Sequence, residues 1–304
     1  MAPKDSKIKN AVVASDDNRI SKEEDAETKN AVVASDLSPI SKEEDVEKQD
    51  KKAEISKNAV EKETGTTDLG ISMDKLNLGP KKKLLVLPIT GLLVHRAHCS
   101  RPITKPKSCS PDFVSGNFMI YKRPYCEGFL KFCFERFDVG IWSSAMEHNI
   151  GGVLDNVMGE FKSKLLFTWD QNQCTKTDFM CLDNKNKPVF LKELDHIWGE
   201  KYTYLPWCDG EYSASNTLLI TDPVKALLNP PNTAISLGSY DPENKEDDLL
   251  GLNGELRVFL EGLAEAKDVQ TYVKDHPIGE PFITPSHADW DYYSKIVRAY
   301  GKNK

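Results

Sequence analysis

Two polar side chains stand just after short apolar runs of the sequence. Ser143 follows Val139–Trp142, and Asp222 follows Thr217–Ile220 after one threonine. Short apolar runs of this length predict buried strands. Ligand sites in α/β sheets lie at the carboxyl ends of strands, so both side chains are candidate ligand-binding groups. A simpler interpretation of Asp222 is a turn or helix N-cap residue before Pro223, a role that needs no metal.

A second set of reactive side chains lies in one proline-containing stretch and comprises His95, His98, Cys99 and Cys109. Their spacing fits no standard zinc-ligand pattern, so we favour a loop with incidental residues. Cysteine-dependent phosphatase chemistry needs an arginine six residues after the cysteine, and that position is Lys105. This stretch therefore gives no specific catalytic signal.

The segments that must position these residues alternate between sequence patterns typical of strands and patterns typical of helices. The predicted strands are residues 84–87, 139–142, 164–169 and 217–220. The predicted helices are residues 124–136, 149–158 and 254–266. A further short helix is predicted from residue 224, and Pro230 and Pro231 must end it. Residues 95–117 contain three prolines and predict a loop-rich insertion. Strands that alternate with helices predict a parallel α/β sheet with right-handed crossovers.

Composition excludes several classes of function. The chain has 304 residues and a formal net charge of −7, without the concentrated basic surface that a duplex nucleic-acid binder needs. The first 30 residues have no apolar signal-peptide core, and their acids argue against a mitochondrial presequence. No apolar run approaches the roughly 20 residues of a membrane span. We expect an intracellular protein, nuclear or cytoplasmic, with reduced thiols and no membrane span.

Residues 1–80 differ from the rest of the chain. They contain no aromatic residue, Cys or His, and their 13 basic and 18 acidic residues contribute −5 of the net charge. The sequence KNAVVASD occurs at residues 9–16 and again at 29–36, which gives a 20-residue duplication. Such a segment cannot bury enough apolar area to offset chain entropy, so we predict a disordered acidic tail. A docking motif presented twice is the alternative.

Four segments, taken in order, resemble the haloacid-dehalogenase-fold phosphatases that act on the RNA polymerase II C-terminal domain, the NLI-interacting-factor-like phosphatase domain. The segments are Lys81–Val94, Lys122–Ala145, Lys187–Gly199 and Asn216–Ile235. The chain looks like a plant-type member with degenerate catalytic motifs. The resemblance implies a Rossmann-like parallel sheet with helices on both faces over residues 81–275. Residues 276–304 are then a C-terminal extension.

The resemblance also assigns residue roles. The family's nucleophilic Asp and its acid/base Asp fall on Pro88 and Thr90 here. Ser143 and Lys192 fall on the phosphate-binding hydroxyl and lysine, and Asp222 falls on a magnesium-ligating Asp, one residue short of the family pattern. Pro88 has neither a nucleophile nor an N–H, and Thr90 cannot relay a proton as a carboxylate would. Losing an acid/base group alone costs about 10²–10⁴ in rate.

Three hypotheses for function follow. The first is a catalytically inactive, phosphatase-like binding or regulatory module with a protein or phosphopeptide partner and no cofactor. The second is an active protein serine/threonine phosphatase that uses magnesium and a displaced carboxylate, although no Asp or Glu lies between Leu84 and Arg101. The third is a presequence-binding subunit similar to mitochondrial inner-membrane translocase receptors, which the missing span and transit peptide disfavour.

Overall fold

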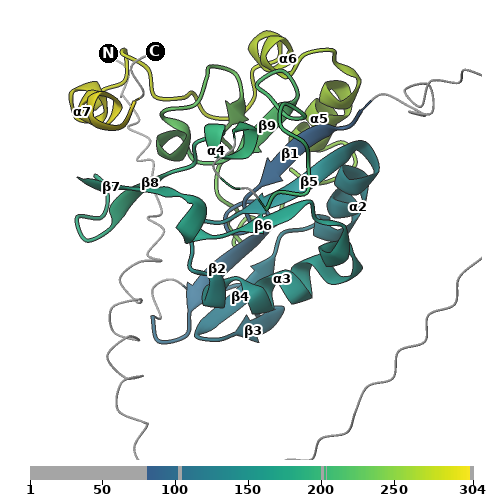
Figure 1. Cartoon of the computed structure of the whole chain (residues 1–304). Coiled ribbons are helices and arrows are strands. Elements are labelled where there is room, and N and C mark those ends of the chain that lie inside the picture. The colour runs from purple at the N-terminus through teal and green to yellow at the C-terminus, as the bar shows by residue number, and fades with distance from the viewer. Residues whose placement is uncertain (1–80, 102–104, 200–201, 203, 302–304) are drawn as a thin grey trace, which may run out of the picture. The chain divides into compact units, whose positions relative to one another are not determined.

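The structure, a computed structural model, describes residues 81–101, 105–199, 202 and 204–301. The predicted tail, residues 1–80 with the duplication, lies outside the described residues. The described elements alternate between strands and helices over most of their length, as the two sequence patterns predict (Figure 1).

A parallel sheet of five strands forms the centre of the fold, in the order β10-β9-β1-β5-β6. The strands are β1 (Lys83–Leu87), β5 (Phe137–Trp142), β6 (Phe167–Trp169), β9 (Thr217–Ile220) and β10 (Ala234–Ile235). β1 and β9 are buried almost throughout because both faces of the sheet are covered. The sheet places the ends of β1 and β9 side by side, where the candidate site lies.

Alternate residues of β1 point into two different hydrophobic clusters. Leu85 and Leu87 pack with residues of helices on one face, and Leu84 and Val86 pack with Trp142 and other residues on the opposite face. The first cluster includes residues of α2 (Cys126–Arg136), α3 (Gly151–Met158), α5 (Glu255–Glu265) and α6 (Val269–Asp275), and the second includes Ile197 of α4 (Asp195–Trp198). The predicted α/β sheet with helices on both faces is therefore confirmed.

The predicted elements differ from the observed ones mainly at their ends. The helix expected to start at residue 149 begins at Gly151, and the strand expected from residue 164 begins at Phe167. The segment expected to enter a helix from residue 224 is a single 3₁₀ turn, Pro223–Ala226. Pro230 lacks an N–H and restricts the residue before it, so an α-helix cannot develop in so short a space.

The prediction of a loop-rich insertion over residues 95–117 was partly wrong. Strands stand at both ends of this range and belong to a three-stranded antiparallel sheet in the order β2-β4-β3, with β2 (Val94–His98), β3 (Phe113–Ser115) and β4 (Phe118–Lys122). Only part of this sheet alternates apolar and polar residues, and its strands are short. β3 and β4 are joined by Gly116 and Asn117 alone, whereas β2 pairs with β4 across the intervening segment, and local periodicity is a weak guide to strands this short.

Two further strands pair with each other outside the central sheet. β7 (Thr175–Met180) and β8 (Pro188–Leu191) form an antiparallel hairpin, beside which α7 (Trp290–Tyr300) lies (Figure 1). Tyr293 and Ile296 of α7 pack with Val189 and Leu191 of β8. The proposed C-terminal extension thus covers one face of the hairpin.

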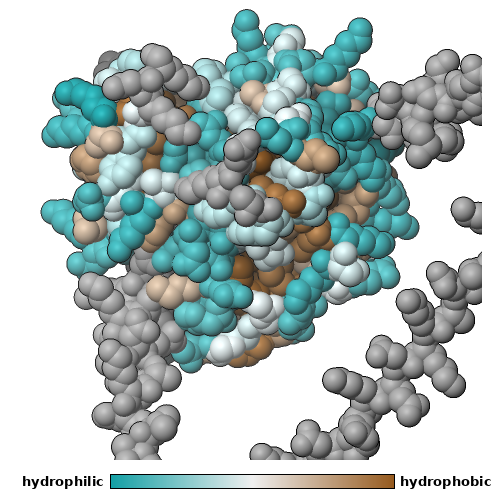
Figure 2. All heavy atoms as spheres, in the orientation of Figure 1, coloured by the Kyte–Doolittle hydropathy of each residue, from teal (hydrophilic) through white to brown (hydrophobic). Residues whose placement is uncertain are grey.

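The edge strand β6 brings the core close to the surface. On the face shown in Figure 2, hydrophobic residues gather over β6 and α3, and hydrophilic residues surround them. Phe167 and Trp169 of β6 are themselves buried, in contact with the rings of Trp207 and Tyr202 respectively. No helix in the described part of the chain is both long and apolar enough to cross a membrane.

Candidate functional site

The loop that follows β1 makes a tight turn at Gly91. Gly91 has a φ of +88°, in the left-handed region that favours glycine, and a Cβ there would lie 3.2 Å from the Ser239 Oγ. The Gly91 carbonyl accepts a 2.7 Å hydrogen bond from the Tyr240 N–H. The turn therefore brings the segment around residue 239 against the end of β1.

Between this loop and the end of β9 lies a small pocket. Its cavity volume is about 30 Å³, which is room for roughly two water molecules. The pocket is lined by Pro88, Thr90, Gly91, Leu92, Ile220, Thr221, Asp222, Lys225, Leu237 and Ser239. It lies at the carboxyl ends of β1 and β9, as expected for a parallel α/β sheet.

Asp222 contributes the only carboxylate among the residues that line the pocket, and a lysine already holds it. The Lys225 Nζ lies 2.6 Å from the Asp222 Oδ2, three residues further along the chain. The Lys225 ammonium lowers the pKa of Asp222 to about 2, so the carboxylate is ionised at neutral pH. Asp222 occupies the predicted N-cap position before Pro223, but its side chain makes no capping hydrogen bond.

Lys192, the position of the phosphate-binding lysine in the resemblance, is buried. Its side chain is 1% exposed, and its Nζ donates a 2.7 Å hydrogen bond to the carbonyl oxygen of Trp142, the last residue of β5. Burial, followed by the charge of Lys225, lowers the pKa of Lys192 to about 7. Near neutral pH the Lys192 side chain is therefore only partly protonated, because burial disfavours the ammonium.

Ser143 also faces the protein interior. It is buried, and its Oγ accepts a 3.1 Å hydrogen bond from the Ala145 N–H. Ser143 and Lys192 meet the same end of β5, because Lys192 bonds to the residue before Ser143. Neither residue lines the pocket that contains Asp222. Of the three site residues that the sequence predicts, the pocket therefore contains Asp222 but neither Ser143 nor Lys192.

Sequence reasoning missed three polar residues of the pocket: Thr221, Lys225 and Ser239. The spacing of Asp222 and Lys225 could have indicated Lys225, because residues three apart in a helical turn are neighbours. Thr221 is 5% exposed, and its Oγ1 has no hydrogen-bond partner within the described residues. No local signal points to Ser239, which only the tertiary structure brings to Gly91.

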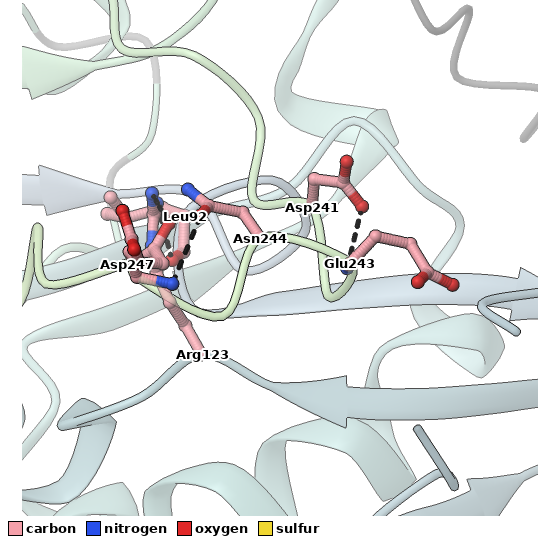
Figure 3. Close-up of polar contacts among 7 residues, drawn as sticks. Leu92, Arg123, Asp241, Glu243, Asn244 and Asp247 are labelled. Carbon is pink, nitrogen blue, oxygen red and sulfur yellow. Dashed lines mark hydrogen bonds and ion pairs between the residues drawn. The ribbon is translucent and has the colours of Figure 1, made fainter. Parts of the chain in front are cut away.

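An ion pair fixes the segment that carries Ser239. Figure 3 shows the Arg123 side chain between Leu92 and Asp247. Two guanidinium nitrogens of Arg123 donate to the Asp247 carboxylate at 2.8 and 2.7 Å, and a third donates to the Leu92 carbonyl at 3.3 Å. The charged side chains of this pair are only 5% and 7% exposed. This clamp joins the end of β4, the loop after β1 and the segment that leads to α5.

The pocket does not fit a magnesium ion. Magnesium takes six oxygen ligands and usually keeps several waters, but this pocket has room for about two and offers one carboxylate. One oxygen of that carboxylate is occupied by the Lys225 ammonium. No cluster of three His, Cys, Asp or Glu side chains that could hold a metal occurs among the described residues. Pro88 and Thr90 stand at the pocket wall and add no carboxylate.

With the fold and the pocket in view, comparison with known proteins defines the class. The sequence pattern of the NLI interacting factor-like phosphatase domain matches residues 83–270, more than half of the chain. The chain therefore belongs to the NLI interacting factor-like phosphatase family, as the four motif segments indicate.

Two curated relatives are each 26% identical to the chain. One is an uncharacterized FCP1 homology domain-containing protein of Schizosaccharomyces pombe, matched over 52% of this chain and 62% of the relative. The other is Nuclear envelope morphology protein 1 of Saccharomyces cerevisiae, matched over 62% of this chain and 41% of the relative. The matched region thus spans less than two thirds of either relative.

Two solved structures are similar to the chain. One is of Fcp1, described as an essential RNA polymerase II CTD phosphatase, with 14% identity, a TM-score of 0.32, and coverage of 72% of this chain and 62% of that chain. The other is of fission yeast Fcp1 bound to beryllium fluoride, with 14% identity, a TM-score of 0.33, and coverage of 74% and 67%.

Proposed function

We propose that this chain is a catalytically inactive member of its phosphatase family that binds a protein or phosphopeptide partner. The observation that carries the proposal is the loop after β1, where Pro88 and Thr90 line the pocket in place of carboxylates. A family member that uses an aspartyl nucleophile and an acid/base Asp cannot run that chemistry with these side chains.

The remaining carboxylate does not replace the lost ones. Asp222, with a pKa of about 2, carries no proton at neutral pH and cannot act as a general acid. Its Oδ2 is engaged by Lys225, which weakens it as a nucleophile and as a metal ligand. The pocket therefore favours binding over hydrolysis.

Hydroxyl groups and a lysine give the pocket the means to bind. Thr90, Thr221 and Ser239 contribute hydroxyls, and Lys225 contributes an ammonium. Ser143 and Lys192 stay proposed phosphate-binding residues, but the Lys192 Nζ must first leave the Trp142 carbonyl to reach an anion. For the compartment we propose the nucleus or cytoplasm. The relative named for nuclear envelope morphology supports the former.

Hydrolysis of an aryl phosphate, with magnesium or with a chelator, tests the proposal. We expect no magnesium-dependent turnover by the wild type. A matched double variant, Pro88→Asp with Thr90→Asp, tests whether the lost carboxylates limit the reaction. Wild-type turnover that needs magnesium, persists through repurification and disappears in Asp222→Asn would show that the chain is an active phosphatase.

A further inference from the structure

We infer that Lys225 is a built-in cation in place of a divalent metal, so that the pocket binds one oxygen of a small oxyanion without any metal. This inference deepens the proposed binding function and rests on it. It assigns to Asp222 the role of lysine partner rather than metal ligand, and it adds Lys225 to the residues proposed to bind the ligand.

The position of Lys225 is the first support. Its Nζ is 2.6 Å from the Asp222 Oδ2, and its side chain is 20% exposed while that of Asp222 is 56% exposed. The backbone also places it, because the Lys192 N–H donates to the Lys225 carbonyl at 2.7 Å and the Lys225 N–H donates to the Asp222 carbonyl at 3.1 Å. The ammonium is thus held at the pocket wall, and a divalent cation beside Asp222 would have to displace it.

Thr221 gives independent support for a ligand. Its side chain lines the pocket and is more than nine-tenths buried, yet its Oγ1 has no hydrogen-bond partner within the described residues. Buried hydroxyls are nearly always satisfied, and an orphaned one marks a site where a water or ligand atom belongs. The backbone of Thr221 is fixed to Ile235 of β10 through a 3.0 Å hydrogen bond, so the hydroxyl is part of a rigid strand end.

The size and charge of the pocket define the ligand. A cavity of about 30 Å³ admits about two water-sized atoms, so it can receive one terminal oxygen of a phosphate or carboxylate while the rest lies outside. Lys225 and Thr221 can both donate to that oxygen, and Thr90 and Ser239 add hydroxyls. The Asp222 charge balances that of Lys225, so we expect only millimolar affinity, about 4 kcal/mol.

Asp222→Asn separates the two roles by the sign of its effect. If Asp222 is a metal ligand, the amide weakens ligand binding. If Asp222 is the lysine partner, the amide removes the competing negative charge and strengthens oxyanion binding. The isosteric change leaves the size of the pocket unaltered.

The experiment is a titration of the full chain with inorganic phosphate, and separately with acetate, in the presence of EDTA, followed by amide chemical shifts of Gly91 and Thr221. We expect saturable binding that Lys225→Met and Thr221→Val each weaken by about tenfold, which is about 1.4 kcal/mol. Lys225→Arg should retain binding, and Asp222→Asn should tighten it. Lys176→Met, which removes an exposed lysine of β7, is the matched control and should bind as the wild type does.

Several results would overturn the inference. They are binding only when magnesium is added, equal binding by the wild type and Lys225→Met, loss of binding in Asp222→Asn, or no saturation with either anion. Preference for phosphate over acetate identifies the oxyanion class. Because no turnover is measured, failure here leaves the question of catalytic inactivity to the hydrolysis assay, and the two proposals can fail separately.

Discussion

Two ion pairs lie near the loop after β1, and they differ in how completely they are buried. In the clamp, Arg123 and Asp247 meet through two hydrogen bonds with both side chains almost fully buried. At the pocket, Lys225 and Asp222 meet through one contact with the carboxylate 56% exposed. The clamp has the features of a structural pair, and the pocket pair is accessible to ligands. The fold thus places an almost fully buried structural pair beside a pocket whose lining has one carboxylate.

The largest effect is expected at the clamp. Asp247→Ala leaves the Arg123 charge buried without its partner, and such a loss costs about 3–5 kcal/mol of folding free energy. Urea unfolding followed by circular dichroism measures it. The matched control is Glu261→Ala, which removes an exposed partner of Arg136 and should cost below about 1 kcal/mol. Equal costs for the two variants would remove the distinction between the regions.

A smaller effect on stability, which depends on pH, is expected from the buried Lys192. The pKa of Lys192 is about 7 in the folded chain, below its ordinary value of 10.5, so the unfolded state binds more protons between these values. Stability should therefore rise with pH from about 7 to 10 and stay at its lower level below 7. Unfolding free energies at pH 6, 7.5 and 9 test this. Relative to Lys192→Met, the wild type should gain stability over this range by up to a few kcal/mol. A difference in unfolding free energy between the wild type and Lys192→Met that stays constant with pH would contradict this prediction.

The smallest effect on stability is expected at the pocket pair. Solvent screens the Asp222 carboxylate, so Lys225→Met should change the unfolding free energy by less than about 1 kcal/mol at neutral pH. The same variant should weaken phosphate binding about tenfold, as proposed above. Thermal unfolding and phosphate titration on one preparation compare the two quantities. A large loss of stability with unchanged phosphate binding would mean that Lys225 has a structural role, as Arg123 of the clamp has.

The sequence by itself determined the main strands and helices of the protein. Apolar runs such as Thr217–Ile220 predicted the buried strands correctly because both faces of a parallel sheet are covered, and the signal is local. The helical pattern over residues 124–136 likewise predicted α2, whose cysteines Cys126 and Cys133 lie in the core. That Pro88 and Thr90 carry no carboxylate is also a property of the residues alone.

Only the tertiary structure decided which polar groups share the pocket. Ser143 stands at a strand end as predicted, but packing turns the Lys192 ammonium to the Trp142 carbonyl, and the Ser143 hydroxyl accepts a hydrogen bond from the Ala145 N–H. Lys225 reaches the pocket because it lies in a 3₁₀ turn. Ser239 reaches it on a segment that Arg123 binds at Asp247, and these two residues are 124 positions apart in the sequence. Periodicity reports which face of an element is buried, whereas the direction of a buried polar group depends on partners that are distant in sequence.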